Sequence, residues 1–124
     1  MRTVKGTLRK GSGDFTRRMT HFPDVFKDAT GESLFPGTIN VQVHEQIKIR
    51  EHFRIRGVDI NEPEQDLLFE ICRINGIWAY RIRPYNLQNG SGGHGDHILE
   101  IACSVELRKE ANFDESAIEI ALFG

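Results

Sequence analysis

The chain has 124 residues, a size typical of one domain, and we expect residues 1–124 to fold as a single unit. Its 16 Lys and Arg residues against 18 Asp and Glu residues give a formal net charge of −2, which argues against a protein that binds nucleic acid mainly through charge. No apolar run approaches the length of a membrane span, and the first ten residues lack the apolar stretch of a signal peptide. We therefore expect a small, soluble, cytoplasmic protein with no nucleic-acid or membrane partner.

The first half of the chain carries several strand signals and one helix signal. Residues 4–8 are predicted to form a first strand. Apolar residues in the segment 22–30 recur at i, i+3, i+4 and i+7, which predicts a helix, and Gly31 is a suitable C-cap. Alternating apolar and polar residues then predict further strands, at 41–43, 47–49 and 53–56.

The second half is predicted to be mostly β-structure. Residues 67–74 and 77–83 are rich in β-branched and aromatic side chains, and the Asn75-Gly76 pair between them favours a type I′ hairpin turn. Apolar runs at 98–103 and 118–122 add strands, and one short helix could run through 105–110. Many short strands separated by turn signals predict an all-β barrel or sandwich.

Two segments have the composition of loops. Residues 61–66 are acidic and are interpreted as a solvated turn. Residues 88–96 contain four glycines and form either a flexible surface linker or a mobile flap over a ligand.

The two cysteines, Cys72 and Cys103, each lie within an apolar run, and neither belongs to a CxxC motif. Two distant cysteines do not make a disulfide framework, whereas free cysteine packs well as a small buried residue. We therefore expect both thiols to be buried and unreactive.

Two glycines stand between the first predicted strand and a group of basic residues, in Gly11-Ser12-Gly13-Asp14-Phe15-Thr16-Arg17-Arg18. Glycine lets backbone N–H groups approach a phosphate closely, and arginine neutralises its charge. The Gly-Lys-Ser/Thr of a P-loop is absent. The segment is therefore either an ordinary hairpin turn or a phosphate-binding loop.

The segment Pro36-Gly37-Thr38-Ile39-Asn40 predicts a turn that enters a strand directly. Residues two apart in an extended chain point the same way, so Thr38 and Asn40 would present oxygen atoms to one side. Two neutral oxygens, completed by phosphate and water, suit Mg²⁺. The alternative is that both side chains only satisfy the turn by local hydrogen bonds.

Other polar residues give weaker signals. The sequence His94-Gly95-Asp96-His97 supplies at most three metal ligands, too few for a closed zinc site. The isolated histidines are expected at the surface; they are His21, His44 and His52. Glu100 points opposite to its apolar neighbours if 98–103 is a strand, so it faces either solvent or a cavity, where it could accept a proton from a hydroxyl group.

Together, and in this order along the chain, the segments resemble the CTP-dependent riboflavin kinases best known from archaea. The matching pieces are the glycine loop 11–15, the Phe22 and Phe26 pair, the turn 36–40, the segment 94–108 and the closing segment 113–118. Only the middle of the chain, 44–88, is too loose to match.

The resemblance implies a six-stranded, Greek-key cradle-loop barrel with one or two short helices, which transfers the γ-phosphoryl group of CTP to the 5′-hydroxyl of riboflavin and gives FMN. By motif position, Thr38 and Asn40 would hold Mg²⁺, and Gly92 and Glu100 would contact the flavin, with Glu100 also the candidate general base. The residues that would border CTP are Gly11, Ser12, Gly13, Asp14, Phe15, Thr16, Val105, Glu106, Leu107 and Arg108.

The chain departs from the family pattern at four positions. Phe15 replaces the last glycine of the loop, Asp14 replaces a glutamate, Gly92 replaces a threonine and Ser104 replaces a proline. These departures concern the nucleotide donor and the chemistry more than the fold.

Three classes of function remain open on the sequence. The first is a kinase that makes FMN from riboflavin, with CTP or ATP as donor. The second is a non-catalytic flavin- or nucleotide-binding module on the same barrel. The third is a small barrel used for protein or nucleic-acid contacts. The presence of both Thr38 and Asn40 favours the kinase, since flavin binding alone needs no pair of metal ligands.

Overall fold

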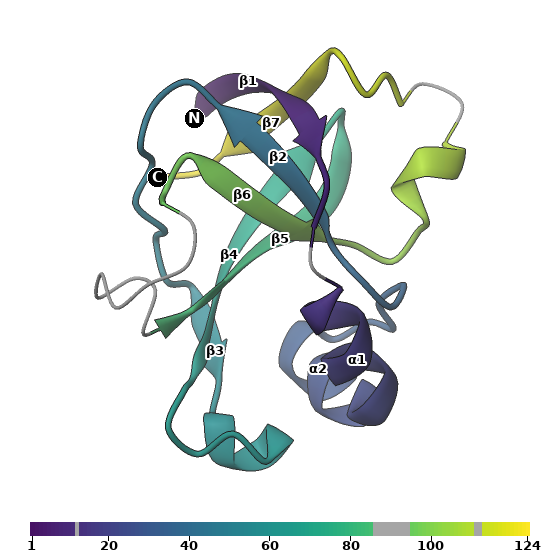
Figure 1. Ribbon diagram of the computed structural model, residues 1–124, viewed down its shortest axis with the longest axis vertical. Coiled ribbons are helices and arrows are strands. Elements are labelled where there is room, and N and C mark those ends of the chain that lie inside the picture. Colours follow the sequence, from purple (N-terminus) through teal and green to yellow (C-terminus); the bar gives the residue numbers. More distant parts are fainter. Residues whose placement is uncertain (12, 86–94, 111–112) are drawn as a thin grey trace.

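The computed structural model describes residues 1–11, 13–85, 95–110 and 113–124 (Figure 1). The elements of this part of the chain are β1 (Arg2–Arg9), α1 (Asp14–His21), α2 (Pro23–Thr30), β2 (Ile39–Val43), β3 (Phe53–Ile55), η1 (Gly57–Ile60), β4 (Leu67–Ile74), β5 (Ile77–Pro84), β6 (Ile98–Ala102), η2 (Leu107–Lys109) and β7 (Ile118–Leu122).

The strands form one antiparallel sheet that closes on itself. Their order is β3-β4-β5-β6-β2-β1-β7, and a further pairing of β4 with β7 closes six of the seven strands into a barrel. The seventh strand, β3, extends the sheet beyond β4. The predicted six-stranded barrel with short helices is confirmed, and closure leaves few exposed strand edges. No helix among the described residues is long and apolar enough to cross a membrane.

The predicted hairpin is present, with β4 and β5 in register from Leu67 opposite Pro84 to Ile74 opposite Ile77. Asn75 and Gly76 both have positive φ, at 46° and 83°, as a type I′ turn requires. The strand expected at 47–49 is absent: Ile47 and Ile49 are buried, but the segment lies outside the sheet. An alternating pattern shows which side chains are buried, not whether the backbone finds a partner.

The helical predictions are only partly correct. Helix α2 is present and ends at Gly31, with a φ of 82°. The helix expected at 105–110 is only the short 3₁₀ turn η2. Helix α1 replaces the hairpin turn considered for 11–18: Gly13, with a φ of 83°, precedes it, and Phe15 and Met19 are buried one turn apart.

Two apolar cores result from this arrangement. One fills the barrel and includes Val41, Leu99 and Ile101. The other lies between the two helices and the outer face of β4 and β5, where Phe26, Phe69 and Ile82 belong to one cluster. Figure 1 shows α1 and α2 beside each other at the end of the molecule where β3 lies, away from both chain termini. The helices therefore cover one part of the barrel wall and reach toward the segment that leads into β2.

Candidate functional site

Three oxygen-bearing side chains from two segments meet on the barrel wall. Asn40 of β2 lies directly opposite Glu100 of β6 in the antiparallel register, so the two side chains share one face of the sheet. The hydroxyl of Thr38, just before β2, lies 3.2 Å from Oε2 of Glu100 and donates to it. Asn40 is buried and Glu100 is half-buried. Glu100 points opposite to Leu99 and Ile101, as the alternation predicted.

Two glycines bring the neighbouring segments close to this group. A Cβ atom on Gly11 would lie 3.0 Å from Nδ2 of Asn40, so the segment after β1 rests on that side chain. A Cβ atom on Gly37 would lie 2.9 Å from Oγ1 of Thr16, and Gly37 has a φ of +120°. The backbone N–H of Gly37 also points at Sδ of Met19, 3.2 Å away. The turn before β2 therefore contacts α1 closely, which only glycine allows at this position.

A pocket of about 240 Å³ opens beside Thr38. Five of the ten residues assigned to the nucleotide by resemblance line it, together with the turn before β2 and the end of β6. The lining residues are Thr16, Phe35, Pro36, Gly37, Thr38, Ile39, Ile101, Cys103, Val105, Glu106, Leu107 and Arg108. Asn40 and Glu100 are not among the lining residues; the hydrogen bond from Thr38 links Glu100 to the pocket, and Asn40 lies opposite Glu100 in the sheet.

Hydrogen bonds hold the walls of this pocket together. The backbone N–H of Phe35 donates to the carbonyl of Cys103 at 2.9 Å, and the Cys103 thiol donates to the carbonyl of Val105 at 3.1 Å. Burial raises the pKa of the Cys103 thiol, so the group is a hydrogen-bond donor here rather than a thiolate. Sequence reasoning missed Phe35 and Cys103 as pocket residues, because nothing in the sequence indicates that 35 and 103 meet.

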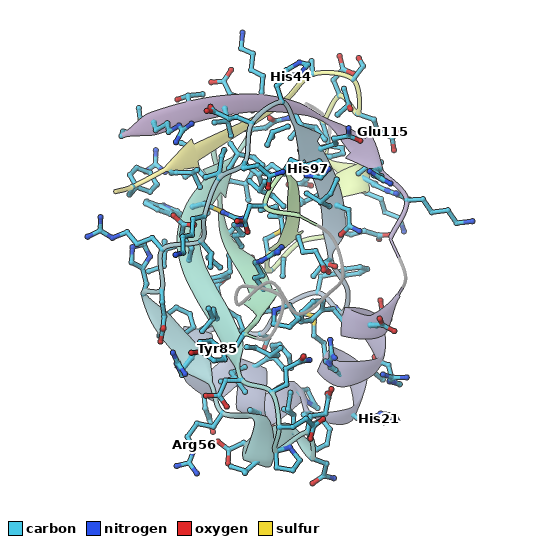
Figure 2. The ribbon with its side chains drawn as sticks, turned by 60° about the vertical axis from the view of Figure 1, so that its left-hand side comes forward. His21, His44, Arg56, Tyr85, His97 and Glu115 are labelled. Carbon is cyan, nitrogen blue, oxygen red and sulfur yellow. The ribbon has the colours of Figure 1, made fainter. Side chains whose placement is uncertain are left out.

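A second, more open groove adjoins the first through Arg108, which lines both. It carries the basic residues Arg9 and Lys10 and the backbone of Gly11 on one side, and Glu115 on the other. Arg108 and Glu115 approach within 3.8 Å and are both exposed, with Glu115 at the edge of the molecule in Figure 2. The groove therefore places three cationic side chains next to the pocket.

The remaining predicted site residues are less directly placed. Ser12 and Gly92 lie outside the described residues. Asp14 is exposed in the first turn of α1, whereas Phe15 is buried in the core between the helices and the sheet. A glycine at position 15 would leave that core unfilled, so the side chain of Phe15 has a packing role.

Arg18, one of the basic residues noted beside the glycine loop, is engaged elsewhere. Its Nε and Nη2 donate to the two carboxylate oxygens of Glu62 at 2.8 and 2.9 Å. The sequence suggested that the segment 61–66 is only a solvated turn. The structure shows that Glu62 in this segment forms an ion pair with Arg18. This ion pair raises the pKa of Arg18 and lowers the pKa of Glu62.

The oxygen donors fit Mg²⁺ better than a transition metal. The hydroxyl of Thr38 and the amide oxygen of Asn40 are neutral oxygen donors, the type that suits Mg²⁺ when phosphate and water supply the remaining ligands. Among the described residues, no group of three or more His, Cys, Asp and Glu residues could hold a metal by itself. Figure 2 shows His21 and His44 far apart, and both are exposed, as predicted.

Comparison of the chain with models of protein families identifies its family. The model of the CTP-dependent riboflavin kinases, described as "Domain of unknown function DUF120", matches residues 9–122. The chain belongs to this family. The match includes the glycine loop and all the residues that line the pocket, which lie at 16, 35–39 and 101–108.

Two curated proteins are similar to nearly the whole chain at modest identity. Both are called riboflavin kinase. The protein from Thermofilum pendens is 26% identical over 97% of this chain, and the protein from Staphylothermus marinus is 27% identical over 97%. The chain spans 58% of the length of the first relative and 91% of the second.

Proposed function

We propose that the protein is a riboflavin kinase that transfers the γ-phosphoryl group of CTP to the 5′-hydroxyl of riboflavin, giving FMN and CDP. One observation supports the proposal: the family match spans the barrel, and matched segments line a pocket at Thr38, whose hydroxyl donates a hydrogen bond to Glu100. In the transfer, the 5′-oxygen forms a bond to the γ-phosphorus, the bond to the β,γ-bridging oxygen breaks, and the hydroxyl proton leaves to a base. Both substrates would have to bind to this one barrel.

The nucleotide is proposed to occupy the pocket and the adjoining groove. The pocket offers the apolar side chains of Ile39, Ile101 and Leu107 to a base or ribose, and the groove offers Arg9, Lys10 and Arg108 to phosphates. Gly13 occupies the N-cap position of α1, where no side chain caps the helix, and the backbone N–H groups of the first turn are proposed to bind a phosphate. CTP rather than ATP as donor follows the name of the family.

Thr38 and Asn40 are proposed to hold Mg²⁺, which would neutralise the charge that develops on the phosphates. Because the Thr38 hydroxyl donates a hydrogen bond to Glu100, the lone pairs of its oxygen remain available to a cation. The carboxylate thereby orients a ligand, as outer groups around metal sites commonly do. Asn40, buried against Gly11, is fixed in position by the same packing.

Glu100 is proposed to contact the riboflavin and to accept the proton of its 5′-hydroxyl. A carboxylate half-buried on the barrel wall, next to the metal ligands, would lie near the point where the acceptor oxygen attacks. Because phosphoryl transfer depends mainly on positioning and charge neutralisation, the base contributes less than the alignment of the substrates.

A donor panel tests the proposal. The purified chain is incubated with riboflavin, Mg²⁺ and one of CTP, ATP, GTP or UTP, and FMN is separated by chromatography. FMN with CTP and much less with the other nucleotides is the expected result. FMN with ATP alone would overturn the donor assignment. Binding of riboflavin or CTP without any FMN would show a binding module instead of a kinase.

A further inference from the structure

A partly buried ion pair joins α1, the helix that contributes Thr16 to the pocket, to the segment after η1. Arg18 belongs to α1, and Glu62 follows η1, 44 positions later in the chain. The guanidinium binds both carboxylate oxygens, at 2.8 and 2.9 Å, and the two side chains are 11% and 27% exposed. Forked geometry and partial burial make such a pair much more specific in position than an ordinary surface ion pair.

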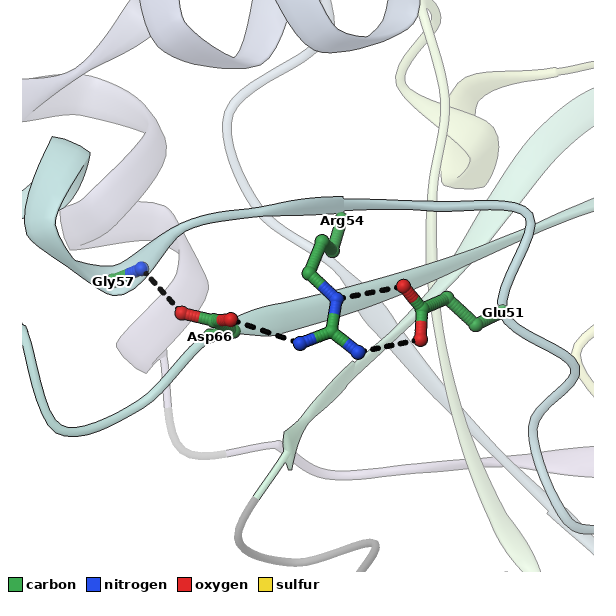
Figure 3. Close-up of polar contacts among 4 residues, drawn as sticks. All are labelled: Glu51, Arg54, Gly57 and Asp66. Carbon is green, nitrogen blue, oxygen red and sulfur yellow. Dashed lines mark hydrogen bonds and ion pairs between the residues drawn. The ribbon is translucent and has the colours of Figure 1, made fainter.

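Glu62 is held by a rigid segment, residues 57–66. A Cβ atom on Gly57 would lie 2.0 Å from the carbonyl oxygen of Glu62, so this segment turns back on itself very tightly. Asp66 accepts the backbone N–H of Gly57 at 2.8 Å, and Arg54 donates to Asp66 and to both oxygens of Glu51 (Figure 3). The segment 57–66 is therefore tied to strand β3.

On the other side of the pair, α1 contacts the turn that leads into the site. The guanidinium of Arg18 lies 5.0 Å from the ring centroid of Phe15, and Phe15 and Met19 are buried. Met19 and Thr16 both contact Gly37, as described above. Thr16 also lines the pocket. Any displacement of α1 would therefore displace the turn that carries Thr38.

We propose that Arg18 and Glu62 are positioning residues, which fix α1 against the 36–38 turn and so set the position of Thr38 and the shape of the nucleotide pocket. The inference about α1 stands on the geometry alone, and its effect on CTP rests on the proposed function. Arg18 acts through the helix and not by contact with a phosphate, because its forked donors are directed at Glu62.

A double-mutant cycle tests this role with the variants Arg18→Gln, Glu62→Gln and the two combined. Hydrogen exchange of the segments 14–21 and 35–38 reports on the docking of α1, and calorimetry measures CTP affinity. Each single variant is expected to raise exchange in both segments by about tenfold and to weaken CTP binding roughly three- to tenfold, and the double variant is expected to equal the singles.

The control is Ile74→Val, a fully buried position at the β4–β5 hairpin. This substitution removes a methyl group from the barrel core and lowers stability. Exchange at 14–21 should then rise no more than exchange in the rest of the chain, and the affinity for CTP should equal that of the wild type. Arg18→Lys keeps the charge but not the fork, and should give an effect between those of Arg and Gln.

Three results would overturn the proposal. They are unchanged exchange in Glu62→Gln, exchange that rises equally over the whole chain, and strictly additive effects of the two substitutions. If the wild-type chain binds no CTP while the exchange pattern changes as expected, the positioning of α1 stands and the proposed function fails.

Discussion

The hydroxyl of Thr38 lies 3.2 Å from Oε2 of Glu100, although the two residues are 62 positions apart. This hydrogen bond joins the turn before β2 to the middle of β6, and the strand register places Asn40 directly beside it. A proposed metal ligand and a proposed general base are thus joined by a hydrogen bond, so the orientation of each side chain depends on the other.

Thr38 should be essential to the reaction and unimportant for folding. Thr38→Ala removes both the proposed metal ligand and the hydrogen bond to Glu100, and we expect turnover to fall at least about 100-fold while the free energy of unfolding changes by less than about 1 kcal/mol. Thr38→Ser keeps the hydroxyl and should retain most of the activity. Initial rates of FMN formation and urea denaturation measure the two effects. Equal rates in the Ala and Ser variants would contradict the role of the hydroxyl.

Glu100→Gln separates the two roles of the carboxylate. The amide oxygen can still accept a hydrogen bond from Thr38, but it cannot accept a proton from riboflavin. If Glu100 is the base, kcat should fall about 100-fold or more while the affinity for riboflavin changes little. Single-turnover kinetics and fluorescence titration of riboflavin measure these quantities. Intact turnover with weakened flavin binding would show that Glu100 binds the flavin and is not the base.

Gly37 should tolerate no side chain. Its φ of +120° is unfavourable for other residues, and a Cβ atom would lie 2.9 Å from Oγ1 of Thr16. We expect Gly37→Ala to destabilise the fold by about 1–3 kcal/mol and to weaken CTP binding. Thr16→Gly in the same chain should relieve the contact but not the backbone strain, and so restore only part of the stability. Full restoration in the double variant, measured by chemical denaturation, would show that strain is unimportant.

The ion pair of Arg18 and Glu62 should make stability depend on pH. Arg18 lowers the pKa of Glu62 below its ordinary value of 4.5, so the folded chain binds this proton less readily than the unfolded chain. The stabilisation is complete above the ordinary pKa and is lost as the pH falls through the lowered one. The unfolding free energy of wild type should therefore exceed that of Glu62→Gln near neutral pH, and the difference should shrink on acidification. The ion pair of Arg54 and Glu51 is present in both the wild type and the Glu62→Gln variant, so its contribution cancels in the difference of the two unfolding free energies. A difference that does not change with pH would contradict this account.

A second ion pair, inside the barrel, should behave differently on mutation. Arg81 and Glu70 lie on β5 and β4, their side chains are 1% and 4% exposed, and Nη1 lies 3.7 Å from Oε1. Burial lowers the pKa of Arg81 to about 10 and raises the pKa of Glu70. Arg81→Met leaves the carboxylate buried without its partner and should cost about 3–5 kcal/mol. Adding Glu70→Gln should recover part of that loss in urea denaturation, and a further loss instead would contradict the pairing.

Local signals in the sequence predicted most of the strands and left a barrel or a sandwich open, and the resemblance to the family then indicated the six-stranded barrel. The Asn75-Gly76 turn and the β-branched and aromatic residues of β4 and β5 are signals carried by residues that are neighbours in the chain. Helix α1 was not predicted: its buried residues Phe15 and Met19 follow a helical spacing, but the glycines before them and the basic residues Arg17 and Arg18 suggested a turn or a phosphate-binding loop. The resemblance of motifs indicated the site residues, whereas composition alone left both interpretations of each motif open.

Contacts between distant segments could not be predicted from the sequence. The hydrogen bond of Thr38 with Glu100 depends on strand pairing, and the ion pair of Arg18 with Glu62 depends on how α1 packs against the segment after η1; no local pattern encodes either arrangement. An acidic segment such as 61–66 has the composition of a solvated turn whether or not an arginine packs against it. The functional interpretation of such residues therefore required the fold.

Transfer of label from CTP to riboflavin tests the central claim most directly. The purified chain is given riboflavin, Mg²⁺ and CTP labelled in its γ-phosphate, and the labelled products are quantified over time. We predict that label enters FMN in one-to-one proportion with the CDP formed, and that Asn40→Ala abolishes both. Labelled inorganic phosphate without labelled FMN, or no CDP at all, would contradict the assignment of this barrel as a riboflavin kinase.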